Sequence, residues 1–232
     1  MKKGLTLAIG AHCGDVEITS AGVLANQRKL GDEIVILHMT LGERGHKRMH
    51  PSEYAEQKRK EALDAGRVLN AEVVFAPYCD GELPYNGEAV NIVNEVIREL
   101  KPTTIITHWK RSIHRDHFFT YDISMDAILL SVLDGVKSKY SQNKNLKGIY
   151  FSENWEDKED FNPYIYYDIS ETIKDWEKSV RKYQLFRGGI SDFPYFDYYK
   201  ALFKLRGSEI GVEYASCFDI ESIKKKVKIS SF

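Results

Sequence analysis

Short apolar runs alternate with longer stretches of helical periodicity along the first half of the chain. The apolar runs are rich in β-branched residues, which is typical of buried strands, and they occupy residues 5–11, 33–40, 72–76 and 103–107. The helical stretches follow them in turn, at residues 16–30, 52–69, 88–100 and 116–133. Four such units in series require crossover connections, which make the strands of one sheet parallel. The pattern therefore predicts a Rossmann-like α/β fold, with a mostly parallel sheet layered between helices.

The second half of the chain has a less regular pattern. We expect two further strands at residues 148–153 and 164–169, and two further helices at residues 171–186 and 195–206. The lysine-rich residues 224–228 are expected to form a solvated strand edge or a frayed end. Since no repeat, low-complexity segment or linker divides the sequence, residues 1–232 are predicted to form a single domain.

The composition and net charge indicate which partners and which cellular location to expect. The 232 residues are 43% hydrophobic, enough for a sizeable core, and the formal net charge is only -1. We therefore expect no nucleic-acid partner. No apolar run approaches the roughly 20 residues that span a bilayer, and the first residues lack a signal-peptide core, so we expect a cytoplasmic protein without membrane insertion. The three cysteines, widely separated, predict no disulfide framework.

Two predicted strands end beside residues that suit metal chemistry. His12-Cys13-Gly14-Asp15 follows the first strand, and His108 and His114-Arg115-Asp116-His117 follow the fourth. The carboxyl ends of parallel strands share one edge of the sheet, and the first and fourth strands are commonly neighbours. Two imidazoles and a carboxylate from these clusters would suit Zn²⁺ with one position open. Each cluster alone is better explained by polar loop residues and helix caps, but their joint position favours the metal site.

The turn after the first strand argues against a dinucleotide enzyme. Such enzymes place G-x-G-x-x-G there, so that the backbone can approach a pyrophosphate. Residues 10–14, GAHCG, do not fit that pattern, and the bulky His12 would occupy the place of the phosphate.

Several motifs, in order along nearly the whole chain, resemble those of the LmbE-like, or PIG-L, N-acetylglucosamine deacetylases. They are AHCGDVE (11–17), LGERG (41–45), KRKEALDAGRVLN (58–70), DGEL (80–83), HWKRSIHRDH (108–117) and the closing RGSEIGVEYASCF (206–218). The resemblance implies a zinc-dependent hydrolase that removes the acyl group from an N-acylated amino sugar or a conjugate of one. It also implies a homo-oligomer, as members of the family often are.

The resemblance assigns roles to individual residues. The metal ligands would be His12, Asp15 and His117. His114 would act as the acid or the oxyanion partner, with Asp116 orienting it, and Tyr214 would lie near the substrate. We further expect the following residues, in the flexible segment after the second strand and in the closing segment, to bind substrate: Glu43, Arg44 and Arg206.

One departure from the family motif bears directly on activity. The family sequence H-P-D-D is replaced by His12-Cys13-Gly14-Asp15 in this chain. Gly14 therefore stands where the family has its proposed general base, an aspartate. Zinc alone could bring water to a pKa near about 7, with His114 moving the proton. Alternatively Glu43 or Glu17 supplies a carboxylate, or the protein binds metal and sugar without turnover. Because loss of a general base costs a factor of about 10² to 10⁴, we expect slow hydrolysis, and Gly14→Asp is expected to raise its rate.

Two other features admit both a structural and a functional interpretation. Cys13 could touch the metal, but a packed thiol beneath the loop is the simpler prediction. Aromatic side chains crowd residues 164–203, where they suit either a subunit interface or a platform for sugar rings. We expect the interface.

Overall fold

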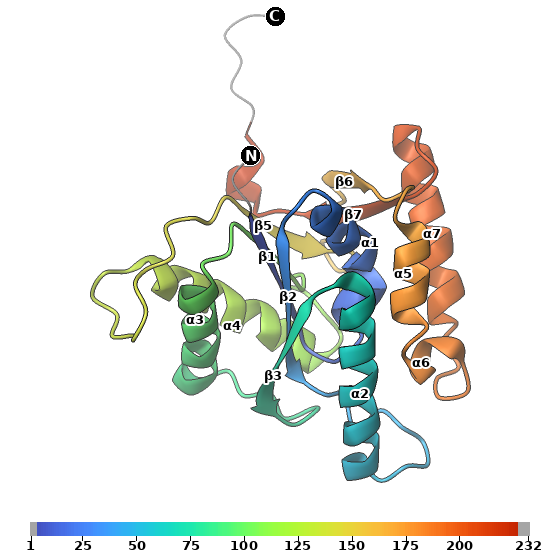
Figure 1. Cartoon of the computed structure of the whole chain (residues 1–232), viewed down its shortest axis with the longest axis horizontal. Coiled ribbons are helices and arrows are strands. Elements are labelled where there is room, and N and C mark those ends of the chain that lie inside the picture. Colours follow the sequence, from blue (N-terminus) through green and yellow to red (C-terminus); the bar gives the residue numbers. More distant parts are fainter. Residues whose placement is uncertain (1–3, 227–232) are drawn as a thin grey trace, which may run out of the picture.

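The computed structural model, which describes residues 4–226, confirms the strand–helix alternation of the first half (Figure 1). Each predicted unit is present, with ends that differ by at most two residues from the sequence pattern. The elements are β1 (Leu5–Gly10), α1 (Asp15–Lys29), β2 (Glu33–Thr40), α2 (Pro51–Leu69), β3 (Glu72–Tyr78), α3 (Gly87–Leu100), β4 (Thr104–Thr107) and α4 (Arg115–Val132).

The strands of the described residues form one mostly parallel sheet, as predicted. Its order is β3-β2-β1-β4-β5-β7-β6, and the first five strands in this order run parallel. β1 and β4 are direct neighbours, with Leu7 opposite Ile105. The loops that follow these two strands therefore emerge side by side at one edge of the sheet.

The second half departs from the prediction in two places. Its elements are β5 (Gly148–Ser152), β6 (Ile165–Asp168), α5 (Ile173–Val180), α6 (Gln184–Arg187), α7 (Tyr195–Ile210), β7 (Ala215–Asp219) and a 3₁₀ turn at Ser222–Lys224. The single helix expected at 171–186 is two helices, because Tyr183 adopts an extended backbone and buries its ring, donating to Glu17 Oε1. β7, antiparallel to both β5 and β6, was not predicted. Residues 227 and 228 of the predicted tail lie outside the described residues.

Helices cover both faces of the sheet, which explains why the strands are almost continuously apolar. Along β1, Ala8 faces a core shared with α1, α2, α5 and α7, whereas Leu7 and Ile9 face a core shared with α3 and α4 (Figure 1). With both faces buried, polar side chains gather at the strand ends. Within residues 4–226, no helix is long and apolar enough to cross a membrane.

Candidate metal centre

The turn between β1 and α1 brings a carboxylate back toward the strand end. Gly14 immediately precedes α1 with φ +109°, a left-handed backbone that glycine adopts without strain. Asp15 is the first residue of the helix, and its Oδ2 accepts a hydrogen bond of 2.8 Å from the amide of His12. The position suits a negative charge, because the positive end of the helix dipole lies there.

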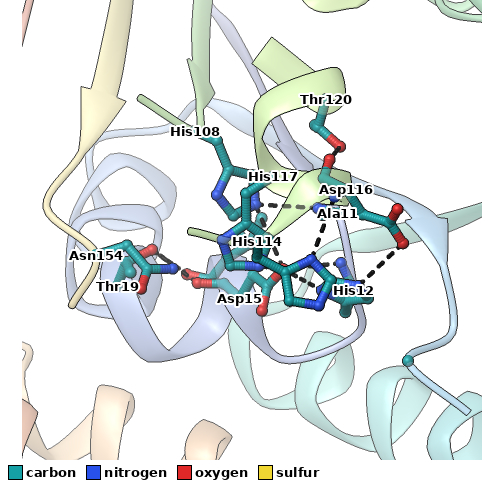
Figure 2. A network of polar contacts seen from close by, with 12 residues as sticks. Ala11, His12, Asp15, Thr19, His108, His114, Asp116, His117, Thr120 and Asn154 are labelled. Atoms are coloured by element: carbon teal, nitrogen blue, oxygen red, sulfur yellow. Dashed lines mark hydrogen bonds and ion pairs between the residues drawn. The ribbon is translucent and has the colours of Figure 1, made fainter. Parts of the chain in front are cut away.

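Asp15 Oδ2 is the point on which the two predicted histidine ligands converge (Figure 2). It lies 3.2 Å from His12 Nδ1 and 3.3 Å from His117 Nε2. Bonds of about 2.0–2.1 Å at tetrahedral angles place the ligand atoms of zinc roughly 3.3 Å apart. The two measured separations therefore fit ligand atoms that share one ion.

Carboxylates fix the other ring nitrogen of each of these histidines. His117 Nδ1 lies 3.0 Å from Asp157 Oδ1, and His12 Nε2 lies 3.1 Å from Asp80 Oδ1. The hydrogen bond to Asp157 holds the proton of His117 on Nδ1 and leaves Nε2 as an electron-pair donor, as is usual for histidines that bind metals. The sequence analysis missed both carboxylates. Asp157 follows β5 and Asp80 follows β3, so the rule that polar residues gather at strand ends would have found them.

His108 belongs to the same network but has no nitrogen to spare. Its Nε2 accepts from the amide of Ala11 at 3.0 Å, and its Nδ1 lies 2.9 Å from Asp157 Oδ2. Among residues 4–226, three overlapping groups have donor atoms close enough for one ion: His12, His114 and His117; Asp15, His108 and His117; and His12, Asp80 and Asp116. Because both nitrogens of His108 are engaged, the expected ligands are His12, Asp15 and His117, a set drawn from the first two of these groups.

His114 faces the pocket as a donor, but Asp116 does not orient it as predicted. His114 Nδ1 accepts from the backbone amide of Asp116 at 3.2 Å, which places the proton of the neutral ring on Nε2. The Asp116 carboxylate instead accepts from the amide of Gly81 and lies 3.4 Å from His12 Nε2. Burial and the nearby charges of His12 and His117 lower the pKa of His114, which favours the neutral form.

The electrostatics of the centre favour a cation. Burial alone would lower the pKa of His117, but the carboxylates of Asp15 and Asp157 outweigh it and raise the pKa to about 10. Burial would likewise raise the pKa of Asp15, yet His117 and His12 hold it well below its usual value. The first shift reflects the carboxylates beside His117, and the second reflects the histidines beside Asp15.

A pocket opens above this centre. Its wall consists of His12, Cys13, Asp15, Ile18, Gly42, Gly45, Lys58, Asp80, His114, His117, Asn154, Trp155, Glu156, Leu185, Phe186, Tyr195 and Tyr199. The metal-ligand candidates and His114 are thus together in one cavity, as the sequence analysis expected.

The predicted substrate-binding residues lie outside this wall. Glu43 accepts from the amide of Asp80, and Arg44 pairs with Glu82, although their neighbours Gly42 and Gly45 do line the pocket. Arg206 makes ion pairs with Glu153 and Glu209.

Tyr214 is also absent from the wall. It follows α7, where Lys204 lies over its ring, and its place near the substrate stays a prediction.

Glu17 is a structural residue and not a pocket carboxylate. It is fully buried, accepts from the hydroxyl of Tyr183 at 2.7 Å and lies 3.4 Å from His38 Nε2. Burial would raise the pKa of Glu17, but the charge of His38 and the hydrogen bonds from His38 and Tyr183 lower it below its usual value of 4.5. His38 is therefore an interior residue.

Glu17→Gln is expected to lower the free energy of unfolding by about 1–3 kcal/mol at pH 7, because a buried hydrogen-bonded charge is lost. Since folding lowers the pKa of Glu17, its contribution is present above pH 4.5 and is lost as the pH falls further. The difference between wild type and variant, measured by urea unfolding, should shrink at acidic pH. The exposed Glu88→Gln, in the first turn of α3, is the control. Equal stability of Glu17→Gln and wild type at pH 7 would contradict this role.

Cys13 and the aromatic residues have mainly packing roles. Cys13 is 2% exposed within the core, and burial raises the pKa of its thiol, which agrees with a packed side chain beneath the loop. Tyr199 and Phe203 belong to the same core, and Tyr195 and Tyr199 border the pocket. Part of the aromatic stripe is therefore core and pocket wall, and its role as a subunit interface stays a prediction.

The fold and the pocket define an α/β protein with a candidate metal centre at the carboxyl edge of a parallel sheet. Residues 7–128, more than half of the chain, match the PIG-L family, described as GlcNAc-PI de-N-acetylase, and the chain belongs to this family. The resemblance seen in the sequence motifs is thus confirmed.

Solved structures with the same fold come from several organisms. The conserved protein TT1542 from Thermus thermophilus is 24% identical, with a TM-score of 0.80 over 98% of this chain and 99% of its own. N,N'-diacetylchitobiose deacetylase from Pyrococcus horikoshii is 21% identical, with a TM-score of 0.80 over 94% and 84%. GalB, the 4-carboxy-2-hydroxymuconate hydratase from Pseudomonas putida, is 16% identical, with a TM-score of 0.82 over 97% and 100%. At these identities the similarity establishes the fold, which accommodates more than one chemistry.

Proposed function

We propose that this chain is a zinc-dependent N-deacetylase that acts on an N-acetylglucosamine-type sugar or a conjugate of one. The observation that carries the proposal is the convergence of His12 Nδ1 and His117 Nε2 on Asp15 Oδ2, in the pocket of a PIG-L family member. The Pyrococcus horikoshii relative, which shares the fold, is a deacetylase of an N-acetylated disaccharide.

In this proposal His12, Asp15 and His117 hold the zinc ion. A zinc ion bound there supplies Lewis-acid polarisation of the amide carbonyl. His114 presents its Nε2 proton to the oxygen that becomes negative during attack, which is the usual task of an oxyanion donor. Trp155 and Tyr195 offer aromatic faces against which a pyranose ring can pack.

We expect purified protein loaded with one equivalent of zinc to release acetate and a free amine from N-acetylglucosamine, its methyl glycoside or N,N'-diacetylchitobiose. Removal of the metal with a chelator should abolish the reaction, and one equivalent of zinc should restore it. Amine release is followed with an amine-reactive fluorophore, with the corresponding deacetylated sugars as standards. Turnover that persists unchanged in protein shown to be metal-free would contradict the proposal.

Because Gly14 replaces the base of the family motif, a second function is a binding protein without turnover. The same assay separates the two, because a binder would show saturable sugar binding by calorimetry and no acetate. The expected homo-oligomer and cytoplasmic location stay predictions, and light scattering of the purified protein would test the first of them.

A further inference from the structure

Among the described residues that line the pocket, three carry carboxylates: Asp15, Asp80 and Glu156. Asp15 is occupied by His12 and His117, as described above. Asp80 accepts from the amide of Arg44 through Oδ2 and faces His12 through Oδ1. Both are therefore engaged in holding the centre together.

Glu156 differs from these two in having a fixed backbone and a carboxylate that accepts no hydrogen bond within residues 4–226. Its amide donates to Asn154 Oδ1 at 3.1 Å, and its carbonyl accepts from the amide of Ile113 at 3.1 Å. No hydrogen bond from residues 4–226 reaches its carboxylate, of which Oε2 lies 3.7 Å from His117 Nε2. The side chain is 20% exposed, so it is reachable by water and sheltered from bulk solvent.

The place that the family motif gives to its base is filled by a ring in this chain. A Cβ added at Gly14 would lie 2.9 Å from Phe186 Cζ and 3.1 Å from Phe186 Cε2, closer than carbon atoms pack. A side chain at position 14 would therefore require the ring of Phe186 to move. The free carboxylate of the pocket comes instead from the loop that follows β5.

We propose that Glu156 is the general base of the hydrolysis, in the role that Gly14 cannot fill. The inference rests on the proposed deacetylase function and adds to it a residue from outside the family motif. It replaces the earlier candidates, since Glu17 is buried in the core and Glu43, which accepts from the amide of Asp80 through one oxygen, does not line the pocket.

The step balances with residues that the pocket contains. Glu156 takes one proton from the attacking water while the oxygen of that water bonds to the amide carbon. The electron pair of the carbonyl double bond moves to the carbonyl oxygen, which faces His114 Nε2–H. When the C–N bond breaks, Glu156 returns that proton to the nitrogen, which leaves as the amine. The second proton of the water remains on acetic acid until it ionises.

The test compares Glu156→Gln and Glu156→Ala with Glu159→Gln, an exposed glutamate three residues further along the same loop. For each protein we would measure zinc equivalents, zinc affinity, thermal stability, and kcat and KM with N-acetylglucosamine or N,N'-diacetylchitobiose. Glu156→Gln should keep one zinc with unchanged affinity and a KM within a few-fold of wild type, while kcat falls by about 10² to 10⁴. Added formate should restore part of the rate of Glu156→Ala, by supplying a carboxylate, and should not help Glu159→Gln.

Three other outcomes would contradict the inference, and one of them would also contradict the proposed function. A kcat of Glu156→Gln within three-fold of wild type overturns the inference and leaves the proposed function standing. Loss of zinc from Glu156→Gln also overturns it, because Glu156 would then be a metal ligand. A wild-type protein that binds zinc but hydrolyses none of these amides removes the proposed function, and this inference with it.

Discussion

Asp15→Asn is expected to weaken zinc binding by more than about 100-fold and to reduce deacetylation to the background rate. Substitution of residues that only orient a ligand typically costs about 10- to 100-fold in affinity, and Asp15 is expected to be a ligand itself. The amide has nearly the same shape and can still accept from the amide of His12, so the turn should stay folded. What is lost is the negative charge between His12 and His117.

Metal content by mass spectrometry and zinc affinity by competition with a chelating dye measure this effect. His117→Ala should show the same loss through a different element of the fold. The control is His50→Asn, which changes an exposed histidine at the start of α2 and retains a side chain able to cap the helix. One tightly held equivalent of zinc in both ligand variants would mean that the ion is held elsewhere.

Gly14→Asp is expected to destabilise the protein and to bring no gain in rate, contrary to what the family motif alone suggests. A non-glycine residue at φ +109° costs about 1–3 kcal/mol, and the contact with Phe186 adds an overpacking cost of about 1–3 kcal/mol. Lys58 Nζ, 3.9 Å from the added Cβ, would attract the new carboxylate. That attraction does not remove the contact with the ring.

Urea unfolding of Gly14→Asp, Phe186→Ala and the double variant tests this account. The double variant should be more stable than the sum of the single effects implies, because the ring that opposes the introduced side chain is gone. Gly211→Asp is the matched control, since Gly211 is left-handed at φ +77° with no atom within 4 Å of the added Cβ. A Gly14→Asp protein as stable as Gly211→Asp and at least ten times faster than wild type would refute both this account and the role of Glu156.

The first half of the fold was predictable from sequence because one rule covers it. Each buried parallel strand is a short apolar run, and each crossover helix has its own period. β7 was missed for a physical reason. It is five residues long and begins directly after a turn, and its place between β5 and β6 depends on pairing across the chain, which periodicity does not encode.

The candidate site, like the fold, was predictable from the sequence only in part. His12, Asp15, His114 and His117 were found because they lie in two dense clusters after neighbouring strands. Glu156 was missed because its importance depends on what surrounds it, namely the ring that blocks Gly14 and the hydrogen bonds that occupy the other carboxylates. Arg206 pairs with Glu153, a contact that its place in a matching motif did not predict, and its role toward the substrate stays a prediction.

The hydrogen bonds of His108 and Asp157 join helix α4 to three loops that follow β1, β4 and β5. The amide of Ala11 at the end of β1, the His108 ring after β4, the Asp157 carboxylate after β5 and the His117 ring on α4 form an unbroken series. A shift of any one loop would break a buried bond in another, so the four segments should open and close cooperatively. The spacing of the candidate ligands is then set in advance by the scaffold, and little reorganisation is needed when an ion arrives.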